Sequence, residues 1–107
     1  MTVTPFAPGH VLSNEPGFYE EGQFGIRIES VVCVTPVTTR RSFGDRRWLG
    51  FERFTTVPIQ TRMVDWALLS AEECEWLEAH NRRCKDKLGP ALKAVGDKRA
   101  LRYLARQ

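Results

Sequence analysis

Two short apolar segments near the start of the chain, each carrying one glutamate, flank a polar stretch. They run from Glu15 to Tyr19 and from Gly25 to Glu29. If they pair as an antiparallel hairpin with Glu15 opposite Glu29, the midpoint falls on Gly22, where glycine and its polar neighbours favour a turn. Directly opposed residues of such a pair have Cβ atoms about 4.5–5.5 Å apart. The sequence therefore predicts a hairpin that brings two carboxylates together.

Two carboxylates at that separation repel each other unless a proton or a cation lies between them. Three roles are open to the pair: it can hold a divalent metal, act as a general acid and base, or diverge into solvent at the rim of the hairpin. Glu29 follows Ile28 and precedes a valine-rich run. The pattern places Glu29 inside an apolar strand, where an unpaired charge is costly, and so favours a paired or metal-bound carboxylate.

Composition describes one ordinary globular domain of 107 residues with 42% hydrophobic and 27% charged residues. Residues 1–39 hold one base against four acids, which suits a cation site, whereas the remainder holds 15 bases against nine acids. Three scattered cysteines predict neither a disulfide framework nor a zinc site. The N-terminal residues lack the pattern of a signal peptide, and no run has the length of a membrane span. We therefore expect a cytoplasmic protein with no membrane partner.

The predicted fold class is α+β. Antiparallel strands are expected at about residues 11–15, 25–34 and 48–57, because these runs are rich in β-branched and aromatic side chains. Ser70 and Glu73 form a capping-box pattern that starts a helix. Apolar residues at helical spacing then predict helices at about 71–88 and 90–105, divided by Gly89 and Pro90.

Other polar residues are weaker candidates for a site. Four arginines between Thr38 and Arg47 suggest nucleic acid, but in a loop without stacking or groove-binding elements they predict a solvated surface and no nucleic-acid partner. Glu52 has Arg53 beside it and is interpreted as a surface ion. His80 is interpreted as a helix residue at an internal interface, and His10 lies in a Pro/Gly segment without support.

Residues 8–19, Pro-Gly-His-Val-Leu-Ser-Asn-Glu-Pro-Gly-Phe-Tyr, followed by Phe-Gly-Ile-Arg-Ile-Glu at 24–29, resemble the end of the catalytic domain of Xaa-Pro aminopeptidases. These are dinuclear metallopeptidases with the pita-bread fold. Residues 50–61 and the helical tail resemble the C-terminal extension of the larger members. The resemblance implies two parts, residues 1–45 as the end of the peptidase domain and residues 46–107 as the extension, with the strands and helices above in those places.

The same resemblance implies roles for four residues of the hairpin. Glu15 would bind one metal ion and Glu29 would bridge two, with manganese the usual metal of the family. Arg27 would lie near the centre and orient a ligand carboxylate, or alternatively form a plain cross-strand ion pair. Tyr19 would lie close to the site, although an aromatic residue there also suits a core. The complete enzyme would use the metals to activate water and cleave the bond before proline, so its substrates would be peptides with proline in second place.

The family completes its metal centre with two aspartates and a histidine from earlier strands, and this sequence shows no such segments. The resemblance therefore predicts a fragment of an aminopeptidase that carries two of five ligands and is inactive by itself, with weak metal binding or none. His10 does not fill the gap. The alternative is a non-catalytic interaction or dimerisation module, which forms a homodimer through its helical tail.

Overall fold

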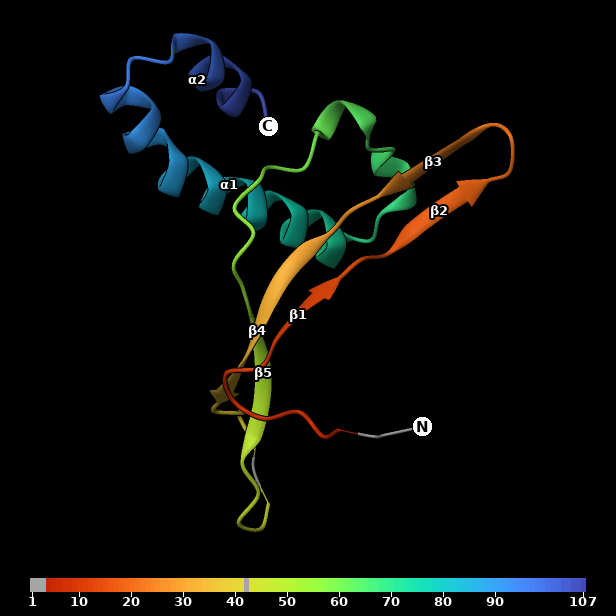
Figure 1. Ribbon diagram of the computed structural model, residues 1–107, viewed down its shortest axis with the longest axis vertical. Helices are drawn as coiled ribbons and strands as arrows, with labels where there is room; N and C mark the ends of the chain where they lie inside the picture. The colour runs from red at the N-terminus through yellow and green to blue at the C-terminus, as the bar shows by residue number, and fades with distance from the viewer. Residues whose placement is uncertain (1–3, 42) are drawn as a thin grey trace. The chain divides into compact units, whose positions relative to one another are not determined.

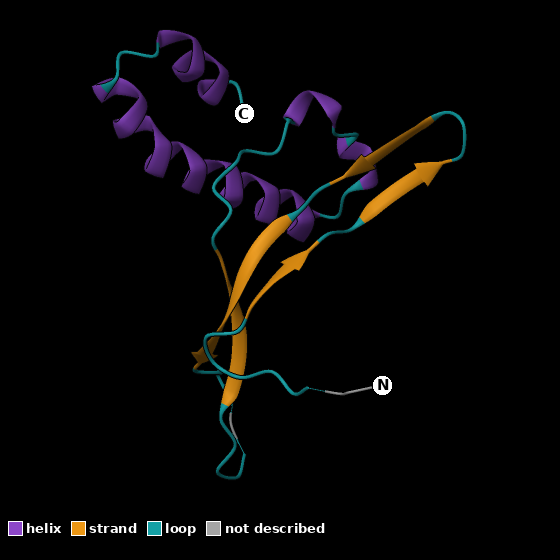
Figure 2. Ribbon diagram, viewed as in Figure 1, coloured by secondary structure: helices purple, strands orange, loops and turns teal. Residues whose placement is uncertain are grey.

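The structure is a computed structural model that describes residues 4–41 and 43–107. It forms two compact units, with the division between Thr55 and Thr56. Strands make up the first unit and helices the second (Figure 2), so the predicted α+β class is confirmed. Residues 1–3 and 42 of the first predicted domain lie outside the described residues, and its boundary near residue 45 stays a prediction. None of the described helices combines the length and the apolarity needed to cross a membrane.

In the described residues of the first unit, five antiparallel strands form two small sheets. The three-stranded sheet has the order β1-β4-β5, and β2 pairs with β3. β4 is the central strand of this sheet. Alternate residues along it, including Val32 and Val34, are buried, because successive side chains of a strand point to opposite faces of the sheet. The bounds are β1 (Val11–Asn14), β2 (Gly17–Glu20), β3 (Phe24–Arg27), β4 (Ser30–Val37) and β5 (Trp48–Arg53).

The hairpin has the predicted register. In every β2–β3 pair the two residue numbers sum to 44, as in Gly17 with Arg27, and the same holds for every β1–β4 pair. Gly22, the predicted midpoint, lies in the turn with a φ of 71°. Figure 1 shows β1 continuing into β2, and β3 into β4, as two long arms. One hairpin register therefore runs through both sheets.

The prediction of an unbroken strand over residues 25–34 was wrong. β3 ends at Arg27 and β4 begins at Ser30, and the other predicted hairpin arm, residues 15–19, forms its strand at Gly17–Glu20. Pro16 explains the interruption, because it accepts a hydrogen bond from the Ile28 N–H (3.1 Å) but has no N–H to return one. Glu29 therefore lies between strands and is exposed, not inside an apolar strand.

β5 is also shorter than the predicted strand over 48–57. Its last partner on β4 is Val32, after which the Phe54 N–H donates to Val31 O (2.8 Å). Thr55 then accepts a hydrogen bond from the Val31 N–H through its hydroxyl (2.8 Å). The Val31 N–H is thus bonded to a side-chain oxygen, and the regular backbone ladder ends there.

The second unit contains two 3₁₀ helices and two α-helices, which are η1 (Thr61–Met63), η2 (Trp66–Leu68), α1 (Ala71–Ala94) and α2 (Lys98–Ala105). The predicted division at Gly89 and Pro90 was wrong, because α1 continues through both. Proline removes one helical hydrogen bond but does not reverse the chain. The reversal comes at Gly96, whose φ of 71° allows the Gly96 and Asp97 N–H groups to bond back to the last turn of α1.

Buried side chains of α1 hold the segment that precedes it. Asn81 is only 2% exposed, and its side-chain amide bonds both backbone groups of Ile59, at 2.8 Å and 2.9 Å. The Nδ2 of Asn81 also donates to the Gln107 carbonyl (3.3 Å). His80 lies one residue earlier, with Nε2 2.8 Å from Val57 O, as suits the predicted internal role. The extended segment, α1 and the end of α2 are thus linked through one buried amide.

The capping box predicted at the start of α1 is present. The Glu73 N–H donates to Ser70 Oγ (3.3 Å), and the Ser70 N–H donates to the Glu73 carboxylate (2.8 Å). We expect Ser70→Ala to lower the free energy of unfolding by about 1 kcal/mol at neutral pH, because one N–H of the first turn loses its acceptor. Urea unfolding followed by circular dichroism measures this, and a variant as stable as the wild type would show that the cap contributes nothing.

The box also predicts a pH dependence. The Ser70 backbone N–H, and after it the Ser70 hydroxyl, lower the pKa of Glu73 below its ordinary value of 4.5. A carboxyl with a lowered pKa in the folded state stabilises the fold above its ordinary pKa, and this contribution is lost as the pH falls through the folded-state pKa. Between pH 7 and pH 3 the wild type should therefore lose more stability than Glu73→Gln. Equal losses in the two proteins would contradict the assignment.

Candidate metal centre

The four predicted site residues lie on the hairpin arms of the first unit. Tyr19 lies on β2 and Arg27 on β3, while Glu15 and Glu29 occupy the links between the two sheets. The register that sums to 44 continues across those links, so it places Glu15 opposite Glu29. The alternation of side chains puts all four residues on one face of the hairpin.

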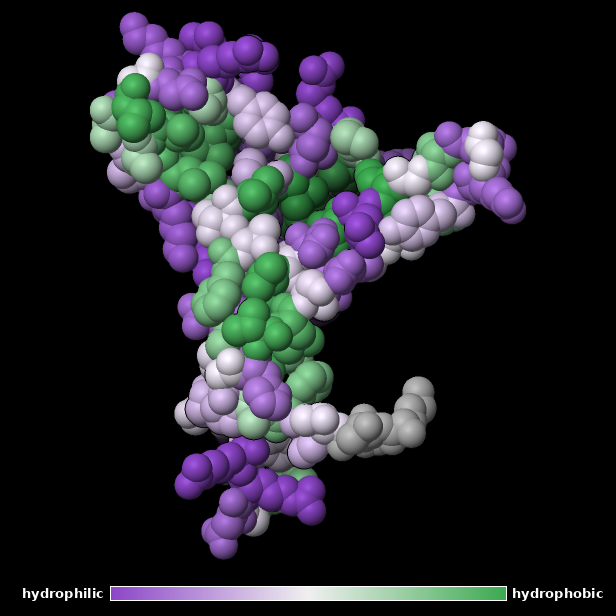
Figure 3. Space-filling view, in the orientation of Figure 1, coloured by the Kyte–Doolittle hydropathy of each residue, from purple (hydrophilic) through white to green (hydrophobic). Residues whose placement is uncertain are grey.

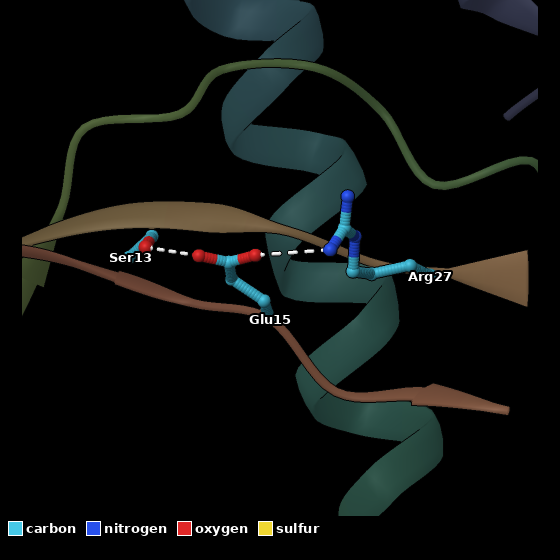
Figure 4. A network of polar contacts seen from close by, with 3 residues as sticks. All are labelled: Ser13, Glu15 and Arg27. Carbon is cyan, nitrogen blue, oxygen red and sulfur yellow. Dashed lines mark hydrogen bonds and ion pairs between the residues drawn. The ribbon is translucent and has the colours of Figure 1, made fainter.

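Glu15 is held from two sides. Arg27 Nη1 lies 3.2 Å from Glu15 Oε2, and the Ser13 hydroxyl donates to Glu15 Oε1. Figure 4 shows the carboxylate between the two groups, with each oxygen directed to a different partner. The side chains of Arg27 and Glu15 are 50% and 39% exposed. An ion pair this exposed contributes at most about 1 kcal/mol, so its main consequence is the orientation of the carboxylate.

Arg27 therefore contacts Glu15. It shares a face with Glu29, as strand alternation predicts, but the ion pair that the structure shows is with the other glutamate. The contact fits both interpretations of Arg27, a cross-strand ion pair and an arginine that orients a ligand carboxylate. Ser13 was not among the sequence candidates. Its signal was available, because it lies two residues before Glu15 and so shares its face of an extended chain.

The donor set suits a hard divalent cation, because carboxylate oxygens are the ligands that such ions prefer. The predicted set of metal ligands contains two residues, Glu15 and Glu29. Across the parts of the chain that the structure describes, no group of three or more His, Cys, Asp or Glu side chains could hold a metal ion. Two carboxylates, Glu15 and Glu29, would fill only part of the coordination shell of such a cation, and a complete shell would need further ligands.

Comparison with known proteins identifies the family. Residues 2–36 match the model of metallopeptidase family M24, and residues 47–107 match the C-terminal region of peptidase_M24. "Probable Xaa-Pro aminopeptidase P" of Laccaria bicolor is 48% identical over 107 residues, all of this chain. The chain belongs to metallopeptidase family M24. The predicted resemblance is confirmed, including the match of the second half to the C-terminal region.

Further relatives support the assignment to family M24. The protein of the same name from Coprinopsis cinerea is 44% identical over 97% of this chain, and that from Fusarium vanettenii is 53% identical over 76%. The X-prolyl aminopeptidase of Caenorhabditis elegans, described as "a cytosolic enzyme with a di-nuclear active site", has a similar structure with a TM-score of 0.83, at 35% identity over 94% of this chain. This chain spans 16% of the length of the Laccaria relative and 16% of the worm protein.

Proposed function

We propose that this chain supplies two metal ligands, Glu15 and Glu29, to the dinuclear centre of an aminopeptidase that removes an N-terminal residue preceding proline. The observation that carries the proposal is the register, which sets the two carboxylates of an M24 family member opposite each other on one face of a hairpin. Glu15 would bind one metal ion and Glu29 would bridge the two. Arg27 and Ser13 hold the Glu15 carboxylate in a fixed direction.

The proposed cofactors are two Mn²⁺ ions and the proposed substrates are peptides with proline in second place. The description of the worm relative supports a dinuclear centre, and the names of the fungal relatives support the Xaa-Pro specificity. We also propose a cytoplasmic location, which the same description of the worm enzyme as cytosolic supports. The remaining ligands of the five come from outside the described residues, so the described part of the chain holds too few to retain both ions.

The test is a chimera in which these 107 residues replace the matching segment of the Laccaria bicolor relative. We expect the chimera to release the first residue of an Arg-Pro-Pro peptide, to lose this activity on treatment with a chelator, and to recover it best with Mn²⁺. A chimera that folds and binds two metal ions but does not cleave the peptide would contradict the proposal. Recovery with Mg²⁺ or Zn²⁺ in place of Mn²⁺ would contradict the metal assignment alone.

The 107-residue chain by itself should show no such activity. Hard divalent cations take about six oxygen ligands, so two glutamates bind through mostly hydrated ions, with a Kd no tighter than about 10⁻³ M. Isothermal titration with Mn²⁺ and a peptide-release assay measure the two expectations. Metal-dependent release of the N-terminal residue by the purified chain would show that the two carboxylates suffice.

A second candidate function is an interaction module, and one observation favours it. The face of the hairpin opposite the carboxylates is apolar and exposed, with Phe18 and Phe24 each 58% and Ile26 43% exposed. Figure 3 likewise shows apolar side chains at the surface of the first unit, in the region of β1, β4 and β5. An apolar face of this kind marks a surface that another chain or segment covers.

Light scattering and mixing separate the two functions. A stable dimer of the 107-residue chain, unchanged by a chelator, would favour the module and a homodimeric partner. Recovery of peptidase activity on mixing the chain with the remaining part of the Laccaria relative would favour the enzyme, because the apolar face would then pack against the rest of the peptidase.

A further inference from the structure

Backbone conformation does not explain why glycine occupies two positions in the strands of the hairpin. Gly17 on β2 and Gly25 on β3 have ordinary strand conformations, whereas Gly9, Gly22 and Gly96 have a positive φ. Strand interiors disfavour glycine, because it loses more chain entropy than other residues and packs no side chain. The side chains around these two positions therefore bear on why glycine occupies them.

The Tyr19 ring supplies that reason. A Cβ atom on Gly17 would lie 2.6 Å from Tyr19 Oη, and a Cβ atom on Gly25 would lie 2.6 Å from Tyr19 Cδ1. Both distances are well inside van der Waals contact, which for carbon atoms is about 3.5–4.0 Å. The ring lies across both glycines, with its base over Gly25, the register partner of Tyr19, and its hydroxyl over Gly17.

The direction of the Tyr19 ring shows which end of the hairpin its hydroxyl faces. Gly17 is the register partner of Arg27 and lies two residues after Glu15. A hydroxyl above Gly17 therefore points from β2 toward the end of the hairpin that carries the Glu15–Arg27 pair. Tyr19 is 64% exposed, so the surrounding core does not fix its rotamer. The open surface above the two glycines is what allows the ring to lie flat in this direction.

We infer that Gly17 and Gly25 are positioning residues, which form a seat that directs the Tyr19 hydroxyl to the carboxylate face for hydrogen bonding during the reaction. The inference rests on the proposed function, because it assumes that chemistry takes place beside Glu15. It adds two residues without polar side-chain atoms to the site. Their contribution is the space that a Cβ atom would occupy.

The test uses the chimera and a double-mutant cycle. Gly25→Ala should displace the ring and lower kcat about 10–100-fold, the range for groups that support a metal centre from outside it, with little change in bound metal. Tyr19→Phe should have a similar effect. The kcat of the double variant should be no lower than that of either single variant. Once the hydroxyl is absent, displacing the ring removes no further interaction. Additive losses would contradict the seat.

Gly50→Ala is the matched control. Gly50 on β5 is also crowded, since a Cβ atom there would lie 2.6 Å from Val37 Cγ1, but it lies in the three-stranded sheet. It should lower the melting temperature and leave kcat unchanged. If Gly25→Ala behaves in the same way, its role is structural and the inference is wrong.

A spectroscopic measurement separates failure of the seat from failure of the proposed function. In a chimera labelled with 3-fluorotyrosine, the Tyr19 signal is the one that Tyr19→Phe removes. Gly25→Ala should shift that signal whether or not the chimera is active, and an unshifted signal would overturn the seat. If Gly25→Ala does not fold, Tyr19→Ala in the same chain should restore folding by removing the ring, and failure to do so would also overturn it.

Discussion

Replacing Glu29 by glutamine in the chimera is expected to lower kcat/KM by more than about a hundredfold, which is the upper range for groups that only support a metal ligand. Glutamine keeps the length of the side chain but offers a single neutral carbonyl oxygen, which is a poor bridge between two cations. Metal content measured by mass spectrometry should fall below two ions per chain. Glu15→Gln should remove one ion for the same reason.

Glu21→Gln is the control for these two variants. Glu21 carries the same charge and is exposed in the turn of the same hairpin, outside β2 and β3. Its replacement should leave both the metal content and kcat/KM unchanged. A Glu29→Gln chimera that kept two metal ions and full activity would show that Glu29 is not a bridging ligand. That result would favour the alternative from the sequence analysis, in which the two carboxylates diverge into solvent at the rim of the hairpin.

The second large effect is expected on stability. Asn81→Leu should lower the free energy of unfolding by about 3 kcal/mol or more, because the N–H and C=O groups of Ile59 lose their partners and each such loss costs about 1–3 kcal/mol. The Gln107 carbonyl loses a partner as well. This is a large fraction of the roughly 5–15 kcal/mol that is usual for a domain. Urea unfolding measures it.

Arg82→Leu is the matched control, because Arg82 follows Asn81 on α1 but is exposed. Surface substitutions of this kind usually change stability by no more than about 0.5 kcal/mol. If both variants lost the same small amount, the hydrogen bonds of Asn81 would not be what holds the segment around Ile59. Loss of stability in Asn81→Leu alone would confirm them.

The hairpin was predictable because its information is local. Glycine at 22 and two apolar arms of equal length define a turn and a register, and both are present in the structure. The interruption of the strands at Pro16 was harder to predict from the sequence. The missing N–H of Pro16 breaks the hydrogen-bond ladder only where a partner strand, here at Ile28, lies opposite it. The continuation of α1 through Pro90 was missed for a related reason, since the end of a helix depends on where a left-handed residue such as Gly96 lets the chain reverse.

The sequence by itself indicated the family, through the resemblance of its motifs, and it determined the hairpin register that pairs position 15 with position 29, because residue spacing along the two arms decides that register. Only the tertiary structure decided which groups each side chain contacts. Arg27 lies against Glu15, the Ser13 hydroxyl takes the other carboxylate oxygen, and the Tyr19 ring lies across two glycines. Those contacts depend on side-chain rotamers in a folded hairpin, where several partners are within reach of each side chain.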